Sequence, residues 1–201
     1  MTGPVVVKLG GSLLQAAELR PWLAALAVLP GAPRVVVPGG GPFADTVRDA
    51  QARLGFHDLA AHRMAILAMQ QYGLMLQALE PRLGLAETST DLTAIPPGAG
   101  MVWLPWRMVG LEPGIEPSWD VTSDSLALWL ARHLSSPRLL LVKSADLPPG
   151  PTDPDALAGA GILDAAFARL AAGYCGMIRC LGRGDTGRLR DLLSADSWSE
   201  P

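Results

Sequence analysis

Short apolar runs alternate with longer stretches of helical periodicity along this chain. The run Val5-Val6-Val7 and residues 34–38 are rich in β-branched side chains, as are strands that are buried on both faces of a parallel sheet. Residues 101–104, 139–143 and 177–181 have a similar apolar character. Strands that alternate with helices favour an α/β architecture. We therefore expect a three-layer αβα sandwich with a mainly parallel central sheet.

Helices are predicted where apolar residues recur every three or four positions. In residues 43–54 one face carries Phe43, Val47, Ala50 and Leu54, and Gly55 ends the helix. The next helix, from a cap at Asp58 to residue 79, is apolar on more than one face, so it is expected in the core or at the subunit interface of a homo-oligomer. Further helices are expected over 13–26, 126–134, 162–172 and 186–193, and Pro- and Gly-rich loops over 81–100, 105–118 and 148–161.

The composition excludes several classes of protein. Of 201 residues, 49% are hydrophobic and 17% are charged, which is typical of a folded chain of one domain or two close lobes. The formal net charge of −3 gives no general attraction to nucleic acid or to an anionic membrane. No apolar run is long enough to span a bilayer, and no signal-peptide pattern opens the sequence. Cys175 and Cys180 form no recognisable zinc or disulfide pattern, so a reducing cytoplasm is expected.

A glycine-rich turn follows each of the first two predicted strands. Gly10-Gly11-Ser12 comes shortly after Lys8, and Gly39-Gly40-Gly41 precedes Pro42, a favoured first residue of a helix. Because parallel strands end at one edge of a sheet, the two turns are expected at the edge where open α/β sheets bind ligands. Backbone N–H groups and one ammonium at such an edge favour a phosphate group. The turns match neither the usual phosphate loop nor the dinucleotide fingerprint.

Lysine is rare in this chain, which singles out the two that remain. The 16 basic residues are fourteen arginines and two lysines, Lys8 and Lys143, and each lysine lies at the end of a predicted strand. A lysine is a compact, mobile point charge that suits a phosphoryl group in transfer. The alternative is that codon bias and chance left these two positions as lysine.

An acidic residue opens the helix that carries residues 126–134. Thr122 or Ser123 is predicted to cap this helix, with Asp124 in its first turn. An acid is favoured at a helix N-terminus by the helix dipole alone, so the sequence by itself supports a structural role for Asp124. His57 and His62 flank the start of the preceding long helix, where capping or packing is favoured over a contact with an acceptor phosphate.

Four motifs, in order along the chain, resemble those of the amino acid kinase family. They are Lys8-Leu9-Gly10-Gly11-Ser12, the Gly39-Gly40-Gly41 turn, Asp120 with Asp124, and Ala145-Asp146-Leu147. The resemblance spans residues 5–147 and implies an amino acid kinase-like fold and an ATP-dependent kinase. It also implies a catalytic centre in which Asp124 orients the cations around the transferring group. Its members here would be Lys8, Gly10, Gly11, Gly40 and Asp124.

The resemblance further implies where each substrate binds in a single domain. Residues 1–134 would form the acceptor-binding half, and residues 135–201 a shortened nucleotide-binding half. Acceptor contacts are expected at Ser12, Gly39, Gly41, His62 and Asp120, and nucleotide contacts at Lys143, Ser144, Ala145, Asp146, Gly182 and Gly184. Mg²⁺ is expected to arrive with ATP, because no carboxylate cluster predicts a metal site in the protein itself.

The chain departs from the family in its last third. Members carry a lysine late in the nucleotide-binding half, whereas here none follows Lys143, so Lys143, Arg179 or Arg183 would have to replace it. Residues 119–125 and the short C-terminal half resemble the small kinases of methanofuran biosynthesis, which implies 5-(aminomethyl)furan-3-ylmethyl phosphate as acceptor and its diphosphate as product. The missing lysine keeps open an alternative, a non-catalytic nucleotide- or oxyanion-binding or storage protein on the same fold.

Overall fold

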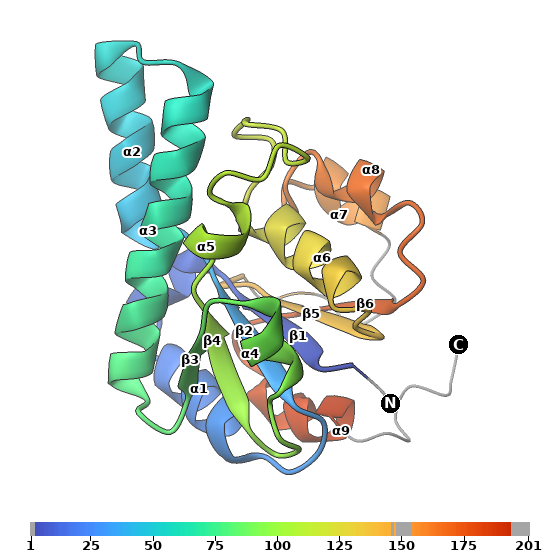
Figure 1. Ribbon diagram of the computed structural model, residues 1–201. Helices are drawn as coiled ribbons and strands as arrows, with labels where there is room; N and C mark the ends of the chain where they lie inside the picture. Colours follow the sequence, from blue (N-terminus) through green and yellow to red (C-terminus); the bar gives the residue numbers. More distant parts are fainter. Residues whose placement is uncertain (1–2, 146, 148–153, 194–201) are drawn as a thin grey trace.

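The chain forms one six-stranded sheet covered by helices (Figure 1). The structure is a computed structural model, and it describes residues 3–145, 147 and 154–193. The strand order is β3-β4-β2-β1-β5-β6, and every pair of neighbouring strands is parallel. The strands are β1 (Val5–Leu9), β2 (Arg34–Pro38), β3 (Gly84–Ala86), β4 (Gly100–Trp103), β5 (Arg138–Val142) and β6 (Met177–Leu181).

Helices form the two outer layers, which confirms the predicted three-layer α/β fold. One face of the sheet carries α6 and α8, and the other face carries α1 and α9 (Figure 1). The helical elements are η1 (Gly11–Gln15), α1 (Leu19–Val28), α2 (Gly41–Leu54), α3 (Asp58–Leu79), α4 (Ser89–Thr93), α5 (Trp106–Val109), α6 (Ser123–His133), α7 (Pro154–Gly159), α8 (Phe167–Ala171), η2 (Asp185–Arg188) and α9 (Leu189–Leu193). None of the described helices is both long and apolar enough to cross a membrane.

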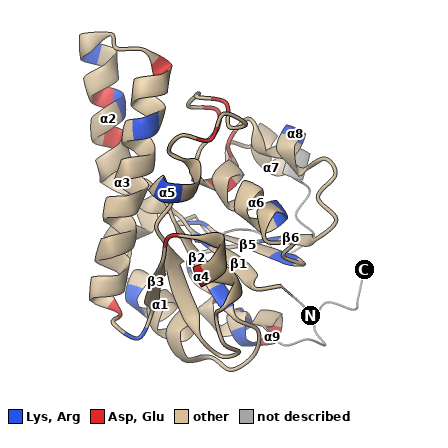
Figure 2. Ribbon diagram, in the orientation of Figure 1, with Lys and Arg blue, Asp and Glu red and all other residues tan. Residues whose placement is uncertain are grey.

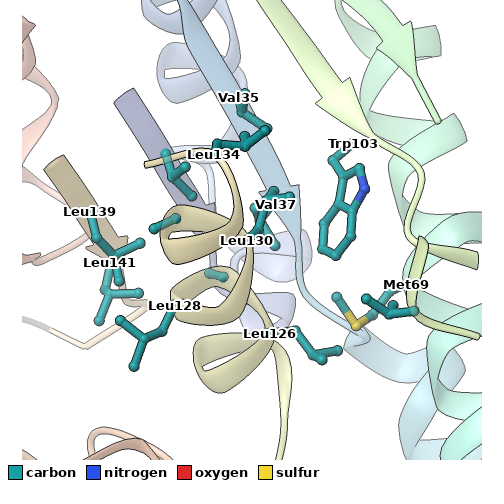
Figure 3. Packing of buried hydrophobic residues seen from close by; sticks show 14 of the residues in the cluster. Val35, Val37, Met69, Trp103, Leu126, Leu128, Leu130, Leu134, Leu139 and Leu141 are labelled. Atoms are coloured by element: carbon teal, nitrogen blue, oxygen red, sulfur yellow. The ribbon is translucent and has the colours of Figure 1, made fainter. Parts of the chain in front are cut away.

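Two apolar clusters fill the space between the layers. The first joins the sheet residues Val35, Val37 and Leu141 to α6 (Figure 3), and the second joins Val36 to α1. Successive residues of β2 therefore point into different clusters, as the period of two along a strand requires. Because both faces of the sheet are covered, β1 and β2 are buried along their whole length.

The direction of the chain across the sheet reverses between β1 and β5. After β1 the chain passes through α1, which packs in the second cluster, whereas after β5 it passes through α7 and α8, which pack against the first. The two connections therefore diverge at the carboxyl ends of adjacent strands. This is the point at which open α/β sheets bind ligands.

The helices α2 and α3 form a hairpin at one end of the sheet and extend beyond it (Figure 1). The predicted apolar face of α2 is only partly buried, since Val47 is 8% exposed but Leu54 is 76% exposed. On α3, Ile66 and Tyr72 are buried where the helix contacts the sheet. Four other apolar side chains of this helix, Leu59, Met64, Leu67 and Leu74, are exposed.

Several segments differ from the sequence prediction because their elements are very short. The predicted loop 81–100 contains β3 and α4, the loop 105–118 contains α5, and the loop 148–161 contains α7. The helix predicted over 162–172 is confined to α8, and the one over 186–193 is divided between η2 and α9. A helix as short as α7, with 6 residues, has little stability of its own and depends on tertiary contacts. The strand β3, with 3 residues, depends in the same way on its pairing with β4.

Candidate active site

Two ammonium groups and one carboxylate meet at the carboxyl edge of the sheet. Lys8 is the penultimate residue of β1, and Lys143 directly follows β5, the strand that pairs with β1. Asp124 lies in the first turn of α6. Lys8 Nζ is 2.8 Å from Asp124 Oδ1, and Lys143 Nζ is 2.5 Å from Asp124 Oδ2. The structure thus brings together both lysines of the chain and the acid that the family resemblance singles out.

Burial gives this cluster unusual electrostatics. The side chains of Lys8 and Asp124 are 6% and 5% exposed. Burial alone would raise the pKa of Asp124, but the charges of Lys8 and Lys143 outweigh it and hold that pKa below its usual value. Burial, and then repulsion by Lys8, lowers the pKa of Lys143 despite its contact with Asp124. Two ammonium groups share one carboxylate, so the cluster carries an excess of positive charge.

The contacts of Asp124 are not equivalent. Its Oδ2 accepts a hydrogen bond from Lys143 Nζ. Its Oδ1 makes no hydrogen bond of good geometry among the described residues, so Lys8 is held mainly as an ion pair. The Lys8 ammonium therefore keeps donor capacity for another acceptor.

The two glycine-rich turns cross each other beside this cluster. A methyl group on Gly11 would clash with the backbone of Gly41, and one on Gly39 would clash with the backbone of Gly11. Gly41 has φ of +53°, in the left-handed region. A methyl group on Gly40 would clash with Ala44. Glycine is therefore required here because two backbones, and the start of α2, approach one another closely.

A cavity of 430 Å³ opens beside the turns. It is lined by the turns, by α2 and α3, and by the segment that precedes α6. The predicted site residues in its wall are Gly11, Ser12, Gly40, Gly41 and His62. The other predicted acceptor and catalytic residues, Lys8, Gly10, Gly39, Asp120 and Asp124, do not line it. Lys8 and Asp124 are nevertheless close in sequence to two residues of the wall, Gly11 and Ser123.

Trp119 closes one side of the cavity, and α2 holds it there. The guanidinium carbon of Arg48 lies 4.4 Å from the centre of the Trp119 ring, and the indole N–H donates to Gln51 Oε1 at 2.6 Å. Asp45 and Asp58 bring carboxylates to the same cavity, and acidic and basic residues lie close together on α2 (Figure 2).

Three charged residues of the cavity wall are not predicted from the sequence: Asp45, Arg48 and Asp58. Asp45 and Arg48 follow Gly41 by four and seven positions, which places them on the helix face that the glycine turn begins. That spacing is the pattern that could have identified them. Asp58 belongs to the next helix and is brought near by the hairpin, so no local pattern points to it.

The two histidines at the start of α3 have different surroundings. His62 is 9% exposed, and burial, followed by the charge of Arg63, lowers its pKa, so the imidazole is uncharged at neutral pH. His57 is the N-cap residue, and its Nδ1 accepts from the Ala60 N–H at 3.2 Å. This corrects the predicted cap at Asp58, whose side chain instead accepts from Gln51 at 2.8 Å.

The residues predicted to bind nucleotide lie around the ends of β5 and β6. The Lys143 N–H donates to the Leu181 carbonyl at 2.8 Å, which brings the loops after these strands together. The hydroxyls of Ser144 and Ser12 are 2.7 Å apart, which joins the β5 loop to the first glycine turn. The Gly182 N–H donates to Asp185. Asp146 lies outside the described residues, and the roles of Lys143, Ser144, Ala145, Gly182 and Gly184 stay predictions.

Helix α6 begins where the sequence predicts, but the predicted cap residue does not supply the capping hydrogen bonds. Thr122 is the N-cap residue, yet its side chain makes no capping hydrogen bond. The capping oxygens come from Asp164, which the sequence does not single out. Asp120, predicted to contact the acceptor, is exposed, and its carbonyl accepts from the Ala166 N–H at 3.1 Å.

Fold and site together define an α/β protein with a buried, positively charged cluster at the switch point of a parallel sheet. The sequence profile of the amino acid kinase family matches residues 3–147, so this chain belongs to the amino acid kinase family. This match confirms the resemblance that the sequence motifs predict over residues 5–147.

Two kinases illustrate the relationship. A [5-(aminomethyl)furan-3-yl]methyl phosphate kinase from Methanocaldococcus jannaschii is 30% identical over 145 residues, which are 70% of this chain and 66% of that protein, slightly under two thirds of its length. The crystal structure of uridylate kinase from Archaeoglobus fulgidus matches with a TM-score of 0.66 at 16% identity, and the match covers 96% of this chain and 97% of that one. The second match shows the shared fold, and the family as a whole supports the predicted kinase.

Proposed function

We propose that this protein is an ATP-dependent kinase that transfers a phosphoryl group to a small acceptor that already carries a phosphate. The observation that carries the proposal is the cluster in which Lys8 and Lys143 share the buried carboxylate of Asp124, next to two glycine-rich turns. Phosphoryl transfer depends on positioning and charge stabilisation more than on covalent chemistry. The excess positive charge of this cluster suits an anionic group in transit.

The acceptor is assigned to the 430 Å³ cavity. Every residue of its wall falls between Gly11 and Leu126, within the proposed acceptor-binding half of residues 1–134. ATP is assigned to the ends of β5 and β6, in residues 135–201, where Lys143, Ser144 and Gly182 lie. The two glycine turns and the lysine cluster stand where these two regions meet, which is supported by the contact between Ser12 and Ser144.

Asp124 would act on the two lysines rather than on a substrate. Its two oxygens hold the two ammonium groups in fixed positions, and fixed donors lose little entropy at the moment of reaction. Lys8 and the N–H groups of the glycine turns would stabilise the charge that spreads over the phosphoryl oxygens in the transition state. Lys143 would take the place of the late lysine of other family members.

The acceptor's own phosphate would make a general base unnecessary. A phosphate oxygen is already ionised near neutral pH, so no side chain has to remove a proton from it. His62, which burial keeps uncharged, would therefore serve as a wall or hydrogen-bonding residue of the acceptor pocket.

Mg²⁺ is proposed to arrive with the nucleotide. Within the described residues, no three His, Cys, Asp or Glu side chains gather closely enough to hold a metal ion. The ion would neutralise charge on the β- and γ-phosphates, as it does in phosphoryl transfer generally. The chain's own contribution would then be the two ammonium groups and the backbone donors.

The best candidate for the acceptor is [5-(aminomethyl)furan-3-yl]methyl phosphate, the substrate named for the relative from M. jannaschii. The cavity offers a match for each of its parts. Arg48 and the glycine turns suit a phosphate, Ile66 and Met69 suit an apolar ring, and Asp45 and Asp58 suit an ammonium group. This assignment rests on one relative and on the mixed charge of the cavity wall.

A coupled assay for ADP release tests the proposal. The panel contains the furan phosphate, the same compound without its amine, isopentenyl phosphate, and the furan alcohol that lacks the phosphate. We expect the highest kcat/KM with the furan phosphate, a loss of at least tenfold without the amine, and no turnover of the alcohol. No ADP release with any phosphorylated acceptor would contradict a kinase of this class.

The second candidate is a non-catalytic nucleotide- or oxyanion-binding or storage protein. The observation in its favour is that no lysine follows Lys143, where family members carry a late lysine. The position of Lys143 beside Asp124 supports the kinase instead, because it supplies the second cation. Tight binding of ATP in calorimetry, without ADP release for any acceptor, would favour the binding protein.

We also propose that the protein forms a homo-oligomer and lies in the cytoplasm. The exposed apolar side chains of α2 and α3, among them Leu54, Leu67 and Leu74, support a face that a second copy covers. Cys175 and Cys180 are both free thiols, which fits a reducing compartment. Light scattering of the purified protein tests the oligomer, and a monomer at micromolar concentration would contradict it.

A further inference from the structure

The carboxylate of Asp164 gathers four hydrogen bonds at the N-terminus of α6. Its Oδ2 accepts from the Thr122 N–H at 3.0 Å, from the Thr122 hydroxyl at 2.9 Å and from the Ser125 N–H at 3.0 Å. Its Oδ1 accepts from the Ser125 hydroxyl at 2.5 Å. A carboxylate in this position satisfies donors that the first turn of a helix leaves unpaired, and its charge opposes the positive end of the helix dipole.

This cap reaches α6 from a distant part of the chain. Thr122 is the N-cap residue, but its hydroxyl donates to Asp164 and does not cap the helix itself. The same segment makes a second tie, because the Ala166 N–H donates to the carbonyl of Asp120. Phe167, which begins α8, is fully buried in the apolar cluster that also contains α6. The start of α6 is therefore fixed from outside rather than by its own sequence.

The turn that Asp164 fixes is the turn that carries Asp124. Thr122 and Ser125, the two residues that it binds, flank Ser123 and Asp124. A shift of this turn would move the Asp124 carboxylate away from Lys8 and Lys143 and leave two buried ammonium groups close together. Like charges in a buried site repel strongly, so the position of both ammonium groups depends on this turn.

We infer that Asp164 is a positioning residue of the active site, which acts on Lys8 and Lys143 through Asp124. The inference rests on the proposed function, because it assigns to that reaction a residue from the C-terminal segment. The family profile ends at residue 147, so this positioning element lies outside the part of the chain that the family match covers.

The two lysines allow a test that does not depend on activity. Lysine labelled with ¹³C at Cε gives two side-chain resonances in this chain, and both report on contacts of Asp124. In Asp164→Asn, which keeps the shape but removes the charge and one acceptor, we expect both resonances to move in the direction they take in Asp124→Asn.

Asp91→Asn is the matched control. Asp91 is the acidic member of the capping box of a short helix, α4, whose N-cap residue is Thr88, and its side chain accepts from the N–H groups of Glu87 and Thr88. Ser89 of α4 contacts His133, at the far end of α6 from Asp124. Its loss should lower stability, as the loss of any cap does, and leave both lysine resonances in place.

Kinetics give the second readout. In Asp164→Asn we expect kcat to fall at least tenfold while the KM for ATP changes less than about threefold, since both ammonium groups are displaced but the other proposed nucleotide residues, Ser144 and Gly182, are not. Asp91→Asn should keep wild-type kcat. Unmoved lysine resonances in a folded Asp164→Asn protein, or equal kinetic effects in the two variants, would overturn the inference.

A milder variant covers the case in which Asp164→Asn does not fold. Ser125→Ala removes only the hydrogen bond to Asp164 Oδ1, and Ser125 does not line the acceptor cavity. We expect smaller shifts of the lysine resonances in the same direction, and their absence would count against Asp164. If the wild type releases no ADP with any acceptor, the proposed function fails, while the lysine resonances still decide the role of Asp164.

Discussion

Two buried cations on neighbouring strands of this sheet have opposite surroundings. Arg34 opens β2, and its guanidinium donates to the backbone carbonyls of Leu26 at 2.8 Å, Leu29 at 2.6 Å and Gly98 at 2.5 Å. Lys8, near the carboxyl end of the adjacent β1, contacts a carboxylate that it shares with Lys143. Neutral groups of the protein satisfy Arg34, whereas Lys8 belongs to a cluster in which, among the described residues, two ammonium groups share one carboxylate.

The two ends of the sheet differ in the same way as these two cations. At the amino end, loops are tied to each other: the Ser136 hydroxyl donates to the Pro4 carbonyl at 2.6 Å, and the Tyr174 hydroxyl donates to the Ser136 carbonyl at 2.8 Å. At the carboxyl end, the glycine turns border a cavity. Arg34 has its hydrogen bonds before any ligand binds, whereas Lys8, in the function proposed above, keeps donors free for substrate.

The largest expected effect is on turnover, in Lys8→Met. This change removes the ammonium group and keeps most of the length of the side chain. We expect turnover to fall on the order of 10³-fold, because one donor to the transition-state charge is lost. The melting temperature should stay within about 3 °C of the wild type, since Asp124 keeps Lys143 as a partner. ADP release and calorimetry measure the two quantities, and near-normal turnover would remove Lys8 from the mechanism.

The opposite outcome is expected for Arg34→Met. The side chain is fully buried, and its removal leaves several backbone carbonyls without their donors. We expect a loss of about 3 kcal/mol or more in the free energy of unfolding, with unchanged turnover for each folded molecule. Urea unfolding, together with kinetics corrected for the folded fraction, measures this. A variant that loses turnover but not stability would break the distinction between the two ends.

These two residues also show how much the sequence predicts. The apolar runs that contain Lys8 and Arg34 are strands, because a β-branched run between turns has few other structures available. The contact among Lys8, Asp124 and Lys143 follows from strand ends that meet at one edge, together with the family motifs. The local sequence pattern is therefore enough to predict those site residues that lie at the ends of predicted strands and helices.

The remaining parts of the site depend on contacts between distant segments. Asp164 caps α6 from about forty positions away, and nothing near Asp164 in the sequence marks it as a cap. Trp119 is held by Arg48 and Gln51 of α2, which no periodicity predicts. The cavity that we propose for the acceptor is for the same reason a product of the fold. Its wall combines the glycine turns, the helical hairpin and the segment before α6.

A smaller effect is expected for Gly41→Ala, and Gly55 at the other end of α2 provides the residue to compare with it. Gly41 and Gly55 both have positive φ, of +53° and +70°. Alanine in this conformation costs about 1–2 kcal/mol of stability at either position. A methyl group on Gly41 also approaches the Gly11 carbonyl, at 3.2 Å, whereas one on Gly55 meets nothing within 4 Å. We expect both variants to lose stability and only Gly41→Ala to raise the acceptor KM, by about threefold or more.

Steady-state kinetics with the acceptor varied checks this pair. Gly55→Ala serves as the control for strain alone, because it lies at the end of α2 that is remote from the glycine turns. Equal KM values in the two variants would mean that the turn at Gly41 serves the fold and not the acceptor.

The smallest expected effect is on the pH dependence of turnover, and it concerns Lys143. Burial, and then the charge of Lys8, lowers the pKa of Lys143 below the usual 10.5. The ammonium group therefore loses its proton at a lower pH than an exposed lysine does, and turnover should fall along an alkaline limb that lies below pH 10.5. The stability of the protein changes with pH in the opposite direction to turnover. The charged form is disfavoured by folding, so this residue's contribution to the free energy of unfolding rises with pH between its folded and unfolded pKa values.

Lys143→Arg isolates this contribution, because a guanidinium stays charged throughout the range. Burial raises the pKa of Tyr72 and Tyr174 to about 12, so both tyrosines lower stability above pH 10 in either protein, and the difference between the two proteins removes that common effect. We expect the alkaline limb of kcat to disappear or to move up in Lys143→Arg, whatever its absolute turnover. We also expect the wild type to gain stability relative to the variant as the pH approaches 10.5. An alkaline limb at the same pH in both proteins would assign it to another group, and Lys143 would then no longer be the titrating cation of the cluster.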